Sequence, residues 1–166
     1  MASPSGRPTM AKKSATSPDS IQRPILLVVS AVSDPTRSSG GWGYVVCYPN
    51  GVEREESGAA AETTVNQMEL MAAIEGLKSI GRGHRLAPVR VLSTSRYLVD
   101  GAKGARARST NADLWARLDI EMKDRSVTWE WEPPGTLFYQ SQTHDAARLA
   151  LKQALQTDVL PQPGHR

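Results

Sequence analysis

The stretch Thr63-Thr-Val-Asn-Gln-Met-Glu-Leu-Met-Ala-Ala-Ile-Glu75 has the pattern of an amphipathic helix with one buried face. Thr63 or Thr64 is suited to cap its N-terminus, because a threonine hydroxyl can accept a hydrogen bond from the first turn. Gly81 and Gly83 favour its end. Four apolar residues, spaced i, i+3, i+4 and i+7, share one face of this helix: Leu70, Ala73, Ile74 and Leu77.

Three strands are predicted before this helix. Residues 25–32 form an apolar, β-branched run that ends in a turn-rich segment. Residues 42–48 form a second strand, and Pro49-Asn50-Gly51 has the composition of a hairpin turn. A third strand follows from Val52, with charged residues on its exposed side. Short connections of this kind predict antiparallel pairing.

Strands and helices alternate after residue 81. We expect a strand at 88–93, a short helix at 95–100, a helix that Asn111 caps and that runs to Met122, a strand at 126–132 and a helix at about 143–155. The order is then β-β-β-α-β-α-α-β-α. It predicts an α/β fold in which a five-stranded mixed sheet is flanked by helices.

The chain is predicted to divide into a basic, Ser/Pro-rich flexible arm (1–22), a folded domain (23–157) and a disordered tail (158–166). No apolar run approaches the roughly 18–20 residues that a membrane span needs. The first residues lack the apolar segment of a secretory signal. A single cysteine, Cys47, excludes an internal disulfide framework, and we expect a cytoplasmic protein.

Charge is segregated within the folded part. Acidic residues dominate the segment 53–75, and basic residues dominate the segment 82–108. Such asymmetry indicates either a side that faces a polyanion or two solvated surfaces of opposite sign.

The helix-opening stretch, together with three further strings, resembles the type 1 ribonuclease H family. Gly40-Gly-Trp-Gly-Tyr44 is similar to the start of the family's second strand, and Ser93-Thr-Ser-Arg-Tyr97 is similar to its TDSQY string. Residues 111–119, Asn-Ala-Asp-Leu-Trp-Ala-Arg-Leu-Asp, are close to its NxDLWxRLD string. The resemblance covers roughly residues 24–156 and implies a ribonuclease H-like fold.

The resemblance implies hydrolysis of the RNA strand of an RNA–DNA hybrid by two Mg²⁺ ions that four carboxylates hold. Only Glu69 and Asp145 match those acids, because Ser30 and Thr94 stand at the other two positions. Gly135 stands where the family has a histidine. Two cations about 4 Å apart repel each other, and half the anionic ligands cannot offset that repulsion. The pattern therefore predicts a degenerate site that requires no cofactor.

Other ligand arrangements are open at this point. Glu69 and Asp145 either hold one weakly bound Mg²⁺ or act only as hydrogen-bonded helix residues. Asp34 and Asp100 lie too far along the chain from the vacated positions to replace them. His144 is expected at the helix surface, pointing away from the direction of Asp145.

Binding of nucleic acid does not require the metal ions, because phosphate contacts supply most of the affinity. The resemblance implies phosphate or groove contacts at Thr64, Asn66, Gln67 and Asn111. Arg96 stands where the family usually has glutamine and adds a charge that could reach a phosphate. The basic loop with Lys103, Arg106 and Arg108 either follows phosphates or is a solvated basic loop. The sequence predicts a ribonuclease H-like pseudoenzyme that binds RNA–DNA hybrid or other structured nucleic acid, or a protein partner. The alternatives are an active hybrid endoribonuclease with compensating ligands and a structural subunit of a larger assembly.

Overall fold

The computed structural model describes residues 22–158. Residues 1–21 and 159–166, which hold nearly all of the predicted arm and tail, lie outside the described residues. The elements are, in order, β1 (Ile25–Asp34), β2 (Ser39–Cys47), β3 (Glu53–Ala61), α1 (Val65–Ser79), a 3-10 turn (Arg82–His84), β4 (Val89–Ser93), α2 (Arg96–Ala102), α3 (Ala112–Met122), β5 (Val127–Trp131) and α4 (Phe138–Asp158).

The five strands form one mixed sheet in the order β3-β2-β1-β4-β5. β1 pairs antiparallel with β2, and β2 pairs antiparallel with β3. β4 pairs parallel with β1, and β5 pairs parallel with β4. The predicted five-stranded mixed sheet is therefore confirmed. β1 and β2 are longer than predicted, because pairing continues to Asp34 opposite Ser39.

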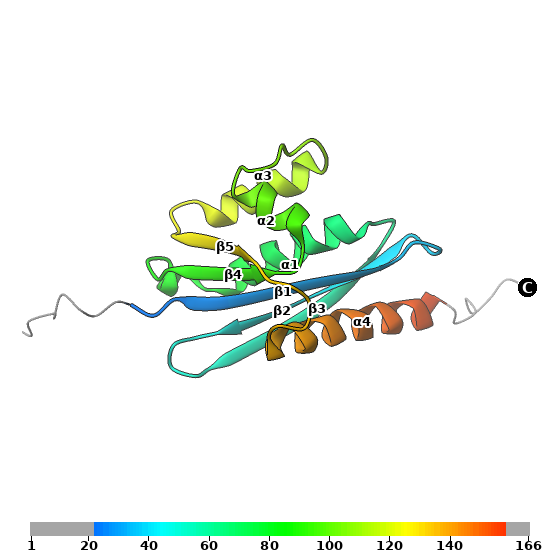
Figure 1. Cartoon of the computed structure of the whole chain (residues 1–166). Helices are drawn as coiled ribbons and strands as arrows, with labels where there is room; N and C mark the ends of the chain where they lie inside the picture. Colours follow the sequence, from blue (N-terminus) through cyan, green and yellow to red (C-terminus); the bar gives the residue numbers. More distant parts are fainter. Residues whose placement is uncertain (1–21, 159–166) are drawn as a thin grey trace, which may run out of the picture.

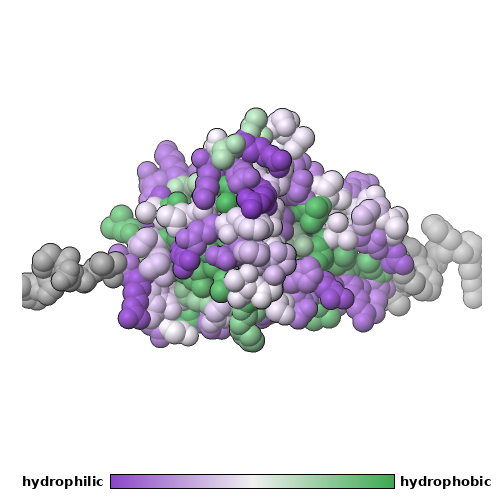
Figure 2. Space-filling model, in the orientation of Figure 1, coloured by the Kyte–Doolittle hydropathy of each residue, from purple (hydrophilic) through white to green (hydrophobic). Residues whose placement is uncertain are grey.

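Helices cover both faces of the sheet. α1, α2 and α3 lie on one side and α4 lies on the other (Figure 1). The main core fills the α1 side, where residues of β1 such as Leu27 and Val29 pack against Ile74 and Leu77 of α1. Hydrophilic and hydrophobic residues are interspersed over the face shown in Figure 2. No helix within residues 22–158 is long and apolar enough to cross a membrane.

α4 begins five residues earlier than the sequence predicts, at Phe138 instead of Thr143. Its buried residues Thr143, Ala147 and Leu151 are spaced by four and face the sheet. A Cβ on Gly41 of β2 would lie 2.2 Å from the carbonyl oxygen of Ala147, and one on Gly43 would lie 2.8 Å from that of Thr143. The two glycines therefore let the backbone of α4 lie directly on β2, and this contact fixes which residues of α4 face the sheet.

Candidate functional site

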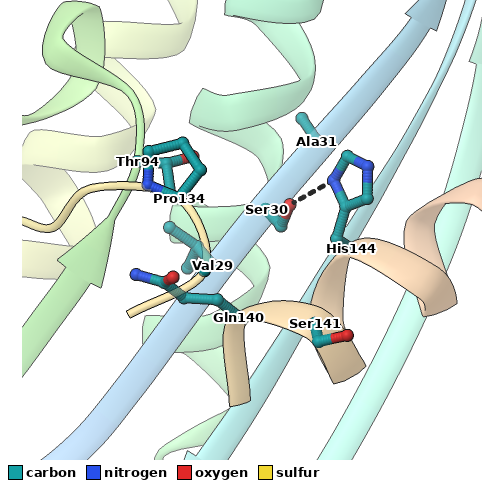
Figure 3. Close-up of a pocket in the computed structure, with 9 residues that line it drawn as sticks. Val29, Ser30, Ala31, Thr94, Pro134, Gln140, Ser141 and His144 are labelled. Atoms are coloured by element: carbon teal, nitrogen blue, oxygen red, sulfur yellow. Dashed lines mark hydrogen bonds between the residues drawn. The ribbon is translucent and has the colours of Figure 1, made fainter. Parts of the chain in front are cut away.

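A cavity of about 320 Å³ lies between β1, the residue that follows β4, the loop after β5 and the first turns of α4 (Figure 3). It contains two of the four predicted site positions, Ser30 from β1 and Thr94 from the end of β4. Its lining comprises Val29, Ser30, Ala31, Thr94, Pro134, Gly135, Gln140, Ser141 and His144. No carboxylate is among these residues, so the cavity presents hydroxyl, amide and imidazole groups.

His144 points into this cavity. Its Nδ1 lies 3.3 Å from the Oγ of Ser30, a hydrogen bond that joins α4 to β1 (Figure 3). His144 is exposed, as expected of a helix-surface residue, and points in another direction than Asp145, but that direction is toward Ser30 and the cavity. The reason is the register of α4, since the contacts of Thr143 and Ala147 with β2 turn His144 toward β1.

Asp145 is exposed and does not line the cavity. It lies midway between the buried residues Thr143 and Ala147, two residues from each. Two residues correspond to about 200° of helical rotation, so Asp145 faces away from the sheet. The structure thus brings Ser30, Thr94 and His144 together and leaves Asp145 outside the group.

Glu69, in the second turn of α1, is 6% exposed. The hydroxyl of Ser93 donates a hydrogen bond of 3.4 Å to its Oε2. Burial raises the pKa of Glu69 to about 7, although hydrogen bonds from Ser93 and from the backbone of Ala31 act in the opposite direction. Because burial disfavours the charged form, Glu69 is a partly protonated acid near neutral pH.

We predict that Glu69→Gln stabilises the protein at high pH and not at low pH. An acid whose pKa is higher in the folded state keeps its proton better when folded, so stability falls as pH rises from about 4.5 to about 7. Over this pH range the free energy of unfolding of the wild type should fall by about 3 kcal/mol relative to that of the variant. Urea unfolding of both proteins at pH 4.5 and pH 8 measures the difference. The same difference at both pH values would contradict a buried, titrating Glu69.

The residues present do not fit a pair of Mg²⁺ ions. The described residues contain no group of three or more His, Cys, Asp or Glu side chains placed to hold a metal ion. Glu69 does not line the cavity; it is buried beside Ser93 and the backbone of Ala31, and burial disfavours its charged form. Mg²⁺ prefers anionic oxygen ligands, and Ser30, Thr94 and His144 supply none.

A second set of predicted residues meets at the N-terminus of α1. Thr64 is the N-cap, and its hydroxyl accepts a hydrogen bond of 3.3 Å from the backbone N–H of Gln67. The Gln67 side chain accepts from the backbone N–H of Thr64 at 3.1 Å and donates to Oδ1 of Asn111 at 3.1 Å. Asn66, the residue before Gln67 in α1, is half-buried. The structure therefore brings Thr64, Gln67 and Asn111 into one hydrogen-bonded group.

Asn111 does not cap α3 in the predicted way. It occupies the N-cap position with φ of 59° and ψ of 40°, and its side chain makes no capping hydrogen bond. Its Nδ2 instead donates to Oη of Tyr97 at 2.9 Å, and the indole of Trp115 donates to the same oxygen at 3.2 Å. The side chain of Asn111 thus forms hydrogen bonds with Gln67 of α1 and Tyr97 of α2 instead of capping α3.

We predict that Asn111→Ala destabilises the protein by about 2–3 kcal/mol, since it removes two hydrogen bonds and places alanine in a left-handed conformation. Asn111→Gly removes the same hydrogen bonds without the conformational cost, so it should cost about 1 kcal/mol less than alanine. Thermal or urea unfolding measures both. Equal losses of stability for the two variants would show that the left-handed conformation at position 111 does not contribute to the cost of the alanine substitution.

The predicted basic residues differ in their surroundings. The guanidinium of Arg96 lies 3.8 Å from the centre of the Trp131 ring, beside the cavity. Arg108 donates to both carboxylate oxygens of Asp119 at 2.8 Å and lies over the ring of Trp115, so it is a structural residue. Lys103 and Arg106 are exposed and form no ion pair with another described residue. The distribution leaves three of these four cations available to a ligand: Arg96, Lys103 and Arg106.

Sequence reasoning missed Arg148 and Lys152 of α4 and the direction of His144. His144, Arg148 and Lys152 are spaced by four, which places them on one helix face. The spacing is visible in the sequence, but its meaning depends on where α4 begins and on which side meets the sheet.

Solved structures with the same arrangement of sheet and helices define the fold class. LC11-RNase H1, isolated from compost, matches with a TM-score of 0.69 and 21% identity, over 79% of this chain and 99% of that one. RNase H1 from Halobacterium salinarum matches with a TM-score of 0.67 and 17% identity, over 79% and 99%. The fold is therefore ribonuclease H-like, as the sequence predicts.

The family follows from sequence. The RNase H family pattern matches residues 29–133. Ribonuclease H of Pseudomonas putida F1 is 39% identical over 105 residues, 55% of this chain and 68% of the relative. Ribonuclease H of Francisella philomiragia is 39% identical over 105 residues, 55% and 66%. The chain belongs to the RNase H family, which confirms the resemblance. The family match ends before α4, so the placement of His144 and Asp145 depends on the structure.

Proposed function

We propose that this RNase H family protein binds RNA–DNA hybrid or a similar structured nucleic acid and does not hydrolyse it by a two-metal mechanism. The supporting observation is the set of side chains that line the cavity, where Ser30 and Thr94 supply hydroxyl groups, His144 supplies an imidazole and no residue supplies a carboxylate. One solved structure of this fold, LC11-RNase H1, is described as a complex with an RNA/DNA hybrid.

The chemistry of the cavity suits a phosphate group better than a cation. Hydroxyl and imidazole N–H groups donate hydrogen bonds to phosphate oxygens, and a phosphate can approach because no lining residue is a carboxylate. Arg96, stacked on Trp131 beside Thr94, adds a positive charge at the edge of the cavity. Lys103 and Arg106 extend the basic surface beyond it.

We therefore expect the full chain to bind a labelled RNA–DNA hybrid in EDTA, with an affinity that Mg²⁺ alters only through ionic strength. Fluorescence anisotropy titrations at 50 and 200 mM salt should show a loss of affinity of about tenfold or more, as phosphate contacts require. A titration in Mg²⁺ at matched ionic strength is the control. No measurable binding at 50 mM salt would refute the proposed function.

A further inference from the structure

Three basic side chains line one edge of α4. His144, Arg148 and Lys152 follow each other at intervals of four residues, so they project from the same face of the helix. Together with Val32, Ser33 and Leu151 they line a second cavity of about 340 Å³ between β1 and α4. Eight residues of helix separate His144 from Lys152, which is about 12 Å, the rise of three to four nucleotides along one strand of a duplex.

This cavity continues at both ends. It shares His144 with the Ser30 cavity, and it shares Lys152 with a further hollow of about 320 Å³ that includes Arg37, Leu155 and Gln156. Arg37 lies in the turn between β1 and β2, toward which the C-terminal half of α4 runs (Figure 1). We call the continuous depression from Ser30 through His144, Arg148 and Lys152 to Arg37 the α4 groove.

The cations of the α4 groove form no ion pairs in the described part of the chain. Arg37, Arg148 and Lys152 are exposed, and none forms an ion pair with another residue of 22–158. Asp34 is the acid that interacts with Arg37. Its pKa is lowered by a hydrogen bond from Thr36 and, to a smaller degree, by the Arg37 charge. Asp145, three residues before Arg148 on α4, forms no ion pair with Arg148 or Lys152. A row of like charges is stabilised when an anionic chain lies along it.

A buried donor lies beside the first part of the groove. Gln140 lines the Ser30 cavity and is 7% exposed, and its Oε1 accepts from the backbone N–H of Thr136 at 3.1 Å. That contact fixes the amide, and its Nε2 has no hydrogen-bond partner in the described residues. A buried donor without a partner is costly, so a ligand acceptor at this end of the groove would be favoured.

We propose that the α4 groove holds the sugar–phosphate backbone of one nucleic-acid strand, which enters at Ser30, Thr94 and His144 and passes Arg148 and Lys152 toward Arg37. This inference rests on the proposed function and names the path of the strand. Hydroxyl and imidazole groups contact one phosphate, and the arginine and lysine neutralise the following phosphates. The regular four-residue spacing of the charges fits a polymer of evenly spaced anions, such as a sugar–phosphate backbone, better than an acidic peptide.

The test compares two variants of the full chain with equal loss of charge. Arg148→Gln with Lys152→Gln removes two cations from the groove, and Lys78→Gln with Lys123→Gln removes two exposed cations from the other side of the sheet. We expect the first variant to bind the labelled hybrid about tenfold more weakly at 100 mM salt, and the slope of log affinity against log salt to fall by about 1.4–1.8. The control should stay within about twofold of the wild type.

The outcomes are distinguishable. Equal affinities for the two variants, with binding by the wild type intact, would overturn the groove and leave the proposed function standing. Absence of binding by the wild type would instead refute the proposed function. Competition experiments with poly-glutamate and with RNA test whether the groove prefers an acidic peptide or a nucleic acid. We expect an RNA oligonucleotide of equal charge to displace the hybrid at much lower concentration, and equal competition would assign the groove to acidic peptides.

Discussion

The triple variant Ser30→Asp, Thr94→Asp, His144→Asp is expected to melt about 5–10 °C higher in saturating Mn²⁺ than in EDTA. The three new carboxylates lie around one cavity, where they repel one another until a divalent cation binds. A ligand at 100 times its dissociation constant stabilises the folded state by about 2.7 kcal/mol. That energy corresponds to the stated shift for a domain of this size.

The wild type is expected to shift by less than about 1 °C under the same conditions, since its cavity offers no carboxylate. The asparagine variant Ser30→Asn, Thr94→Asn, His144→Asn is the matched control, because it has nearly the same side-chain volume without the charge. Differential scanning fluorimetry of the three proteins measures the effect. A wild-type shift as large as that of the aspartate variant would show that the natural residues do hold metal ions.

Gly41→Ala is expected to cost about 3 kcal/mol and to lower the melting temperature by about 6–12 °C. The added Cβ would lie 2.2 Å from the carbonyl oxygen of Ala147, and backbone atoms on both sides leave no flexible group to move aside. α4 must therefore shift away from β2, which also moves His144 relative to Ser30. Thermal unfolding measures the loss of stability.

Gly81→Ala is the control for this substitution, because a Cβ at Gly81 meets no atom within 4 Å. It should change stability by less than about 0.5 kcal/mol. If Gly41→Ala were as mild as Gly81→Ala, the packing of α4 on β2 would be looser than the structure indicates, and the assignment of His144 to the cavity would lose its basis.

Local patterns were sufficient to predict the fold. The spacing of Leu70, Ala73, Ile74 and Leu77 identifies α1, and the structure selects Thr64 as its cap. The ends of β1 and β2 were less predictable, since Asp34 and Ser39 belong to strands only through their mutual pairing. β3 carries mostly exposed polar residues at the edge of the sheet, so its extent to Ala61 depends on pairing with β2 rather than on burial.

The candidate site was predictable where local sequence determines it. Ser30 and Thr94 follow from the acid positions that the family resemblance implies, and Thr64 and Gln67 follow from the helix start. The choice between His144 and Asp145 was not predictable in this way. It depends on the contact of Ala147 with Gly41, which are more than 100 residues apart, and a shift of one residue in α4 exchanges an acid for an imidazole at the cavity.

Ion pairs and stacking on aromatic rings determine which basic side chains can contact a ligand. Arg108 looked equivalent to Lys103 and Arg106 in the sequence, yet Asp119 and Trp115 hold it in place. Arg148 and Lys152 were overlooked because their segment shows no excess of basic residues. Their common face exists only once α4 lies on the sheet, which again is a property of the tertiary structure.

We propose that the cavity of this RNase H family member accepts phosphate and does not support two-metal hydrolysis. Incubation of excess wild-type protein with a labelled RNA–DNA hybrid in Mg²⁺ or Mn²⁺, beside the Glu69→Gln variant, tests it most directly. We predict that the hybrid stays bound and intact with both proteins. RNA fragments that appear with the wild type in Mg²⁺ and are absent with Glu69→Gln would contradict it.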